Sequence, residues 1–271
     1  MVTEMNDESA NEALLRPVRS GNVFEETVNR LLQLVWLGVY EPGDALPPER
    51  ELASKLGVGR DTVRQAIKSL SDAEYFTTKR GRYGGTFFAD TVPRRHSTVS
   101  RRVWTPADIA DLLGMREVLE VGAIRLASRR TRTAVERDVL WMRLSEVEQA
   151  GPDDYRRLDS RLHLTFAELA GVRTLTPLLA DNRMALNELL DQIPLLGPNI
   201  AHSNHQHRAA AMAVLTGDES GVAGAMQEHL SGTAALLHGF LDGAPTRQGN
   251  EDRDATDLVE TGPHGPPGLP S

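Results

Sequence analysis

Cysteine is absent from the 271-residue sequence, and no apolar run approaches the length of a membrane span. The first absence excludes a disulfide framework and predicts a protein of the reducing cytoplasm. The second predicts that no helix crosses a membrane, because a spanning helix needs about 20 apolar residues. Residues 1–19 are acidic and polar, without the basic and apolar regions of a signal peptide. We therefore expect a cytoplasmic protein without a membrane anchor.

Positive charge is scarce overall but concentrated in one segment. The 38 Asp and Glu residues outnumber the 30 Lys and Arg residues, which gives a formal net charge of −8. Between residues 60 and 82, six basic residues stand against three acidic ones, a local charge of +3. A basic segment within an acidic chain is the distribution expected of a protein that contacts nucleic acid through one surface. The length allows two domains of ordinary size.

Two short helices joined by a tight turn are predicted between residues 48 and 70. The first begins at Pro48-Glu49, since proline suits the first helical turn and Glu suits the positive helix end. Gly57 ends it in the manner of a C-cap. The second carries an apolar inner face of Val63, Ala66, Ile67 and Leu70. This spacing is typical of a helix-turn-helix, whose second helix enters the major groove of DNA.

The outer face of the second helix carries the side chains suited to reading bases. They are Arg60, Arg64, Gln65 and Lys68. Arginine can hydrogen-bond two acceptors of guanine, and glutamine can do the same with adenine. Basic residues on one helix face can also be merely solvated, so the segments that follow decide between the two interpretations.

A basic hairpin follows the second helix. Residues 75–78 and 86–88 are two β-prone runs, and the segment between them, residues 79–85, is glycine-rich and cationic. Arg80 and Gly81 lie at its tip, which suits contact with phosphates or the minor groove. A further helix from Val23 to Leu37, with an inner stripe of Val28, Leu31, Leu32 and Val35, would complete a three-helix core.

The stretch from Leu46 to Phe88 resembles the N-terminal domain of the GntR family of bacterial transcription regulators. The matching elements are Leu46-Pro47-Pro48-Glu49-Arg50-Glu51-Leu52-Ala53, Leu56-Gly57-Val58, Thr62-Val63-Arg64 with Ala66, and Gly81 with Gly84-Gly85-Thr86-Phe87. The resemblance implies a winged helix-turn-helix that contacts operator DNA through Arg50, Arg60 and Arg64, with Thr62 as a lesser contact. Gly59 and Asp61 depart from the family pattern, which often has serine or threonine at the first position and threonine at the second.

The rest of the chain is predicted to be helical from Pro106 onward. Apolar periodicity indicates six helices, at residues 109–127, 134–150, 152–170, 175–190, 200–216 and 218–241, with Gly151, Gly171 and Gly217 as caps. Short links between six helices favour an antiparallel bundle. The expected fold is therefore mainly α, with an N-terminal winged helix-turn-helix, a small β-wing and a C-terminal antiparallel all-helical bundle.

Five segments are predicted along the chain. They are a mobile N-terminus (1–20), a DNA-binding domain (21–89), a linker (90–104), an effector-binding domain (105–242) and a disordered tail (243–271). The linker is marked by Pro93 and by arginine pairs that we expect to be solvated. The tail contains 5 Gly and 5 Pro in 29 residues, a composition typical of disorder.

A carboxylate and three imidazoles form a candidate metal site in the bundle. Asp159 and His163 stand at i and i+4 on one helix face, while His207 and His229 belong to later helices. This donor set suits zinc or another divalent transition metal, nickel and manganese included. His205, two residues from His207, would point elsewhere on its helix. By spacing alone, scattered surface or core histidines are the favoured interpretation, because a lone histidine is more often one of these than a metal ligand.

Residues 105–241 resemble the all-helical ligand-binding domain of the FadR-type branch of the same family, the FCD domain. The match covers Asp159-Ser160-Arg161-Leu162-His163, His207 ahead of Gly217-Asp218, and His229-Leu230. It implies that Asp159, His163, His207 and His229 bind a metal.

The same resemblance points to an effector-binding arginine. It covers the Arg-x-x-Leu-Glu element at Arg116-Glu117-Val118-Leu119-Glu120, and it implies that Arg116 pairs with an acidic effector. A surface ion pair with Glu120 at i+4 is the alternative. Arg183 and Asn182 are weaker candidates for the effector cavity.

The leading hypothesis is a ligand-responsive transcription regulator, not an enzyme. A homodimer would bind a near-palindromic DNA operator, and a small carboxylate effector would bind the metal and Arg116. Repression relieved by the effector is the expected sign, and activation is the alternative. A metal-ion sensor and a zinc-dependent hydrolase are the rival functions. The hydrolase lacks support, because the sequence contains neither an HExxH motif nor a nucleophile motif.

Overall fold

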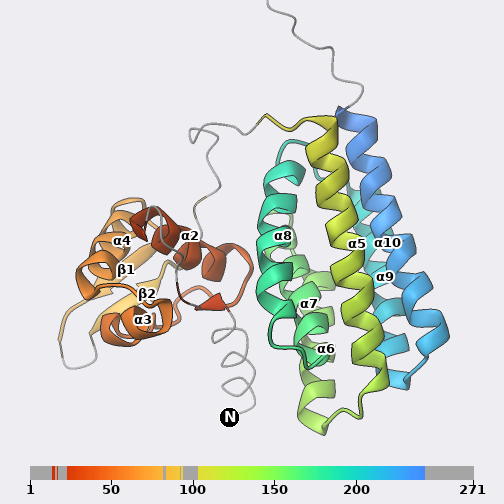
Figure 1. Cartoon of the computed structure of the whole chain (residues 1–271), viewed down its shortest axis with the longest axis horizontal. Coiled ribbons are helices and arrows are strands. Elements are labelled where there is room, and N and C mark those ends of the chain that lie inside the picture. The colour runs from red at the N-terminus through yellow and green to blue at the C-terminus, as the bar shows by residue number, and fades with distance from the viewer. Residues whose placement is uncertain are drawn as a thin grey trace, which may run out of the picture.

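The computed structural model describes residues 14, 15, 17, 23–81, 84–91, 93 and 103–241. The described residues form an N-terminal domain of three helices with a two-stranded wing and a C-terminal domain of six helices (Figure 1). The fold predicted from sequence is confirmed. Most of the predicted mobile N-terminus, most of the linker including its arginine pairs, Arg82 and the predicted tail from residue 243 lie outside the described residues. Leu14 and Leu15, within the predicted mobile segment, are described and buried in the apolar cluster of the N-terminal domain.

The N-terminal domain is a winged helix-turn-helix. Helices α2 (Val23–Trp36), α3 (Glu49–Leu56) and α4 (Arg60–Asp72) pack against one another. Gly57 ends α3 in a left-handed conformation, at φ +65°, which glycine adopts without a steric penalty. Strands β1 (Phe76–Lys79) and β2 (Gly85–Phe88) pair in antiparallel register, with Phe76 opposite Phe88.

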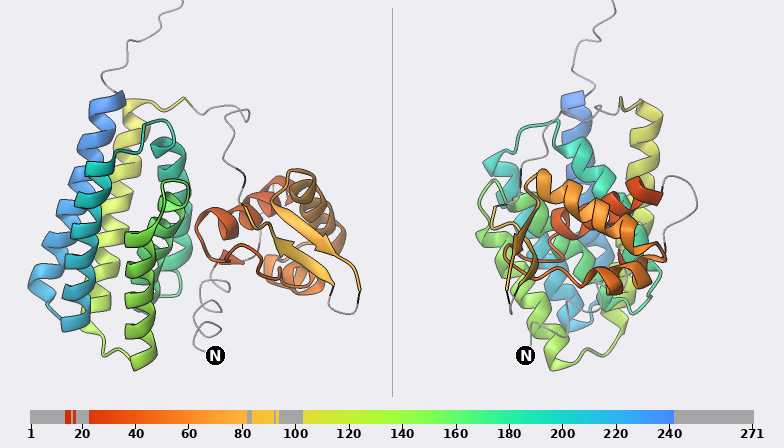
Figure 2. Two further views of the ribbon diagram at one scale, coloured as in Figure 1. Left: turned by 180° about the vertical axis from the view of Figure 1, so that it is seen from behind. Right: turned by 90° about the vertical axis from the view of Figure 1, so that its left-hand side faces the viewer.

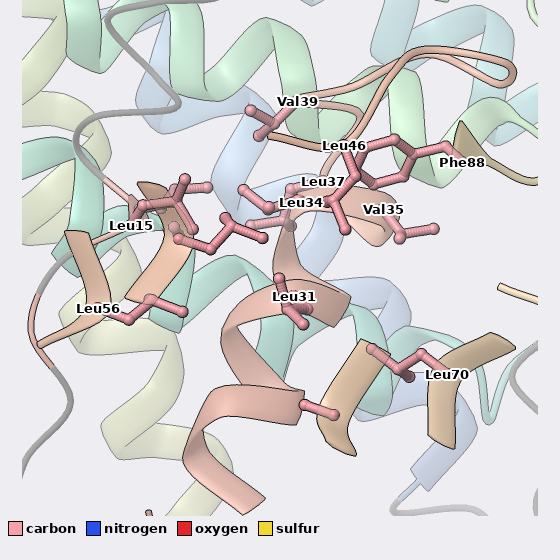
Figure 3. Close-up of a cluster of buried hydrophobic side chains, with 14 of the residues drawn as sticks. Leu15, Leu31, Leu34, Val35, Leu37, Val39, Leu46, Leu56, Leu70 and Phe88 are labelled. Carbon is pink, nitrogen blue, oxygen red and sulfur yellow. The ribbon is translucent and has the colours of Figure 1, made fainter. Parts of the chain in front are cut away.

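One buried apolar cluster holds this domain together and continues into the next. Leu31, Leu34, Leu56, Leu70 and Phe88 are among its side chains, and Figure 3 shows how they converge. The same cluster includes residues of the helical domain, namely Leu119, Ala123, Leu164, Ala167, Leu179 and Ala180. The two domains therefore share buried apolar surface, which is the main stabilising term in such a contact.

The C-terminal domain is a bundle of six helices. These are α5 (Pro106–Arg129), α6 (Ala134–Gln149), α7 (Tyr155–Leu169), α8 (Leu175–Leu190), α9 (Gly197–Thr216) and α10 (Glu219–Leu241). Helix α5 contacts α7, α8, α9 and α10, and α6 packs against α7 and α9. The helices lie side by side in one bundle (Figure 2). None of the described helices is long and apolar enough to cross a membrane.

Ion pairs join the DNA-binding domain to α7 and α8. Arg30 Nη1 and Gln33 Nε2 of α2 each lie 2.7 Å from Asp181 Oδ1 of α8. Glu41, just after α2, accepts a 3.0 Å hydrogen bond from Arg157 of α7. Both helices therefore touch the DNA-binding domain on one side and the interior of the bundle on the other.

The structure corrects several details of the predicted elements. On α5, Val118 is 71% exposed and Leu126 is also exposed, although both belong to the apolar periodicity that predicts this helix. On α2, Leu31 and Val35 are buried as predicted and Leu34 is buried with them, while Val28 and Leu32 are only partly buried. A helical stripe is wide, so periodicity alone misplaces residues at its edges.

Glycine caps were predicted correctly at only some helix ends. Gly217 ends α9, and Gly171 follows α7, each at φ +73°. Gly151 plays no such role, because α6 ends at Gln149 and its C-cap residue, Ala150, is extended. Two capping boxes at Thr105 and Thr133 start α5 and α6, and each uses an acidic residue three positions on.

Candidate functional site

Four side chains from three helices meet inside the bundle. Asp159 and His163 come from α7, His207 from α9 and His229 from α10, and all four are buried. One potential ligand atom of each lies within 4.8 Å of the others. The structure thus brings together the four residues that the sequence nominated from separate helices.

The spacing of these atoms fits a metal ion. His207 Nε2 lies 3.2 Å from His163 Nε2, 3.3 Å from His229 Nε2 and 3.2 Å from Asp159 Oδ1. Zinc binds nitrogen at about 2.0–2.1 Å in a tetrahedron, which puts neighbouring ligand atoms about 3.3 Å apart. Three imidazole nitrogens at this separation have no reason to converge unless they share a proton or a cation.

The protonation of the cluster suits a cation. Burial lowers the pKa of His207 to about 3, and burial together with His207 lowers the pKa of His229 well below its ordinary value. Both imidazoles are therefore neutral at neutral pH, the form that binds metals. Burial opposes ionisation of Asp159, but Arg183, His163 and His207 outweigh it and hold its pKa below the ordinary value.

Glu120 of α5 connects this cluster to two buried arginines, and the sequence interpretation missed that role. The side chain is 1% exposed. Its carboxylate lies 2.7 Å from His163 Nδ1, accepts a 3.1 Å hydrogen bond from Arg116 Nε and lies 3.6 Å from Arg183 Nη1. Burial raises the pKa of Glu120, yet Arg116, His163 and Arg183 together hold it well below its ordinary value. The group is thus a carboxylate.

The position of Glu120 orients His163. A proton on Nδ1 that faces the carboxylate leaves the lone pair of Nε2 directed toward His207 and Asp159. Histidines that bind metals usually have such a partner on the second nitrogen. The i+4 spacing from Arg116 was visible in the sequence, but it suggested only a surface pair; the pair forms, and it is buried.

A cavity of about 330 Å³ opens beside the cluster. Asp159, His229, Arg116 and Arg183 lie in its wall. Arg183 donates to Asp159 and to Ser160 Oγ. By contrast, the buried Nη1 of Arg116 has no hydrogen-bond partner among the described residues, and its Nη2 lies 3.3 Å from His229 Nε2. The wall therefore offers a buried N–H donor next to the histidine cluster.

The other sequence candidates lie elsewhere. Asn182 Nδ2 donates to the backbone carbonyl of Leu112 and does not line the cavity. His205 is exposed, while His202 lies at the cavity wall, 3.0 Å from Gln206.

On the DNA-binding domain, the nominated residues occupy one exposed region. Arg50 of α3 and Arg60, Arg64 and Gln65 of α4 are exposed, and Thr62 is partly buried. Arg80 and Gly81 are exposed beside the wing.

The two departures from the family pattern have structural consequences at the start of α4. Gly59 occupies the N-cap and provides no side-chain cap. Asp61 lies 3.1 Å from Arg64 Nη1, and Glu49 lies 3.4 Å from its Nε. Arg64 is therefore already paired with two acidic residues.

The chain matches two known protein families over successive segments. Residues 24–88 match the bacterial regulatory proteins of the gntR family, and residues 111–232 match the FCD domain. The chain belongs to the GntR family. It is a DNA-binding transcription regulator whose second domain is an FCD ligand-binding domain.

Similar proteins are regulators as well. An Escherichia coli (strain K12) protein, named as an L-lactate dehydrogenase operon regulatory protein, is 27% identical over 221 residues, which cover 76% of this regulator and 83% of that protein. The HTH-type transcriptional repressor NanR of Salmonella arizonae is 26% identical over 240 residues, covering 83% and 88%. Among solved structures, E. coli McbR/YncC covers 81% of this chain and 98% of its own, with 17% identity and a TM-score of 0.49.

Replacing Glu120 with alanine tests how far the buried charges depend on it. Arg116 and Arg183 are buried and would lose their shared carboxylate, so we expect the free energy of unfolding to fall by about 3–5 kcal/mol. Urea denaturation in the presence of a chelator measures this. Glu117→Ala is the matched control, because Glu117 is exposed on the same helix, and it should cost less than about 0.5 kcal/mol. A loss below about 1 kcal/mol for Glu120→Ala would contradict the assigned role.

Proposed function

We propose that this GntR-family regulator binds a divalent transition metal through Asp159, His163, His207 and His229, and senses a small carboxylate that binds next to the metal. The observation that carries the proposal is the convergence of three imidazole nitrogens and a carboxylate at metal-ligand spacing. Zinc suits this donor set best, and nickel and manganese also accept it. The metal, when bound, supplies a positive charge with open coordination positions.

Charge balance supports an anionic effector. Without a metal, the cluster contains two cations, Arg116 and Arg183, and two anions, Asp159 and Glu120, so its net charge is zero. A divalent ion brings the site to +2 in a region without bulk water, where an unbalanced charge is costly. A carboxylate restores much of the balance.

Arg116 is the residue best placed to hold that carboxylate. Its unpartnered Nη1 can donate to an effector oxygen, and an arginine–carboxylate hydrogen bond is among the stronger ones. Arg183 contributes charge but already donates to Asp159 and Ser160. The E. coli relative whose name refers to the L-lactate dehydrogenase operon is consistent with a small carboxylate as the signal.

Operator contacts are assigned to the exposed residues of the N-terminal domain. We expect Arg60, Arg64 and Gln65 to reach base edges, Thr62 to support them, and Arg50, Arg80 and Gly81 to contact the backbone or minor groove. The effector is expected to relieve repression. It acts on α7 and α8, whose outer faces hold the DNA-binding domain through Arg157 and Asp181.

A homodimer would place two such domains on one operator, and an exposed face of α5 supports it. Asp111, Val118 and Arg125 are spaced by seven residues, or two turns, so they share one face. All three are exposed, and Asp111 and Arg125 have no ion-pair partner among the described residues. An antiparallel pairing of two α5 helices about Val118 would bring Asp111 of each against Arg125 of the other.

Two glycines fit the same pairing. Gly114 and Gly122 lie four residues before and after Val118, and a Cβ built on either meets nothing within 4 Å. Glycine inside a helix costs about 1 kcal/mol relative to alanine, a cost that close helix contact would offset. Met115, 51% exposed, adds apolar surface to this face.

Zinc should bind the purified protein and raise its melting temperature, because it binds only the folded cluster. His163→Ala should abolish this stabilisation. Glu120→Gln should weaken zinc binding by about 10- to 100-fold, since the residue orients His163. Competition with a chromophoric chelator measures the affinity, and His205→Ala is the exposed control on α9. Equal zinc affinity in His163→Ala and wild type would refute the metal site.

A DNA-binding assay with the same purified protein distinguishes a metal sensor from an effector-binding regulator. DNA binding is measured with chelator, with zinc, and with zinc plus L-lactate or acetate. A response to zinc alone supports a sensor, and a response to the acids that requires zinc supports the proposed function.

DNA binding tests the recognition helix. Arg60→Ala with Arg64→Ala should lower affinity for the promoter of the protein's own gene by at least about tenfold, since each lost base contact costs about 1–3 kcal/mol. Asp61→Asn should raise affinity, because it frees Arg64 and removes an anion near phosphates. Asp72→Asn, at the far end of α4, is the charge-matched control. Fluorescence anisotropy across a salt series measures both effects; unchanged affinity in the double variant would exclude these residues from the interface.

Charge reversal tests the α5 pairing. Asp111→Arg or Arg125→Asp alone would place like charges together and should weaken the dimer at least tenfold, while the double variant should restore it. Sedimentation equilibrium gives the dissociation constants. Asp138→Arg, exposed on α6, is the control. If the single variants dimerise like wild type, or if the double variant fails to recover, α5 is not the interface.

A further inference from the structure

The effector cavity has a polar end and an apolar end about two helical turns apart. Three helices each contribute one polar and one apolar residue to this arrangement. Arg183 and Leu190 of α8, His207 and Ile200 of α9, and His229 and Leu236 of α10 are each separated by seven residues. Seven residues of helix span about 10 Å. Leu190, Ile200 and Leu236 all line the cavity.

These three apolar residues lie at the same end. Helices α9 and α10 are joined by a short turn and pack side by side, with His207 and His229 in contact. The chain before His207 therefore runs alongside the chain after His229. Leu190 shares a buried cluster with Leu237, and Leu236 packs against that cluster, so the ends of α8 and α10 also meet. Ile193, Leu195 and Leu196 extend this apolar wall.

The arginine at the apolar end, Arg156, already has hydrogen-bond and ion-pair partners. Arg156 lines the cavity there, but its Nη2 donates to the carbonyl oxygens of Leu190 and Ile193, at 2.6 and 3.1 Å. Its Nε lies 3.0 Å from Asp191. Arg156 thus fixes the loop after α8, and no other lysine or arginine among the described lining residues faces this end. A second carboxylate would find no cation there to pair with.

Hydroxyl groups lie closer to the polar end. Ser203 Oγ is 3.4 Å from His229 Nδ1, and Thr233 is one turn from His229 on α10. Both residues line the cavity. An effector hydroxyl close to the carboxylate would find partners there, whereas the far end is lined mainly by leucine and isoleucine, with Asn199 beside Ile200.

We propose that the effector is a monocarboxylate with an apolar tail, rather than a dicarboxylate or a polyhydroxylated sugar acid. This inference rests on the proposed carboxylate site beside the metal, and it adds the tail. The carboxylate lies at the polar end with Arg116, and the tail extends along the cavity toward Leu190, Ile200 and Leu236. Burial of each methylene in such a cavity contributes about 0.8 kcal/mol.

Calorimetric titration of the zinc-loaded full-length protein tests this with acetate, butanoate, hexanoate and octanoate, then with hexanedioate and gluconate. Affinity should rise about fourfold per methylene, the fold-change equivalent to 0.8 kcal/mol, until the tail fills the cavity. Hexanedioate and gluconate should bind at least tenfold more weakly than hexanoate.

Two variants locate the tail. Leu236→Gln should reduce octanoate affinity far more than acetate affinity, and Ile200→Gln provides a second test if the first variant does not fold. Arg116→Ala should weaken all the acids by a similar factor. Leu178→Gln, at an exposed site on α8, is the matched control and should leave the series unchanged.

The outcomes distinguish the two proposals. If none of the acids binds the zinc-loaded protein, the carboxylate site itself fails. If acetate binds but affinity does not rise with chain length, or if hexanedioate or gluconate binds more tightly than hexanoate, the apolar tail is refuted while the carboxylate site stands. A chain-length dependence that is identical in Leu236→Gln, Ile200→Gln and wild type also overturns the tail assignment.

Discussion

The structure of the bundle depends on one group of charges held away from water. Arg116 and Arg183 face Glu120 and Asp159 in its interior, and each charge remains there only because an opposite charge lies within about hydrogen-bonding distance. These contacts fix which faces of α5, α7 and α8 point inward. That arrangement positions the histidine cluster and the cavity beside it, since Glu120 contacts His163 and Arg116 lies next to His229.

The same helices connect the interior to the DNA-binding domain. Asp159 and Arg157 are two residues apart on α7, so the first faces the cluster and the second reaches Glu41. On α8, Arg183 points inward and Asp181 pairs with Arg30. Gly38, at φ +62°, allows the chain after α2 to approach α7 so closely that a Cβ there would lie 3.2 Å from Arg157. The buried charges thus lie on helices that also contact the DNA-binding domain, α8 at α2 and α7 at the segment after it.

Sequence patterns predicted the fold and nominated the four residues of the cluster, because both depend on local spacing and on recognisable motifs. They failed where position in space decides. The sequence suggested that Glu120 is the i+4 partner of a surface arginine. In the structure Arg116 and Glu120 do pair, but both are buried and Glu120 also contacts His163 of α7. Val118 continues an apolar stripe in sequence, yet it lies outside the bundle. Periodicity records that a face is apolar, and it does not record whether that face meets the same chain or another one.

The charges at the recognition helix α4 are a reason to expect that two copies of the chain bind DNA together. Asp61 and Glu49 already pair with Arg64, so this arginine must give up those partners before it contacts DNA. The chain as a whole carries a net charge of −8, which opposes nonspecific attraction to phosphates. In the proposed homodimer, base contacts made twice, by two domains held at a fixed separation, would supply the affinity. A dimer joined through the helical domains would provide that separation, and its geometry would respond to the same helices that surround the effector.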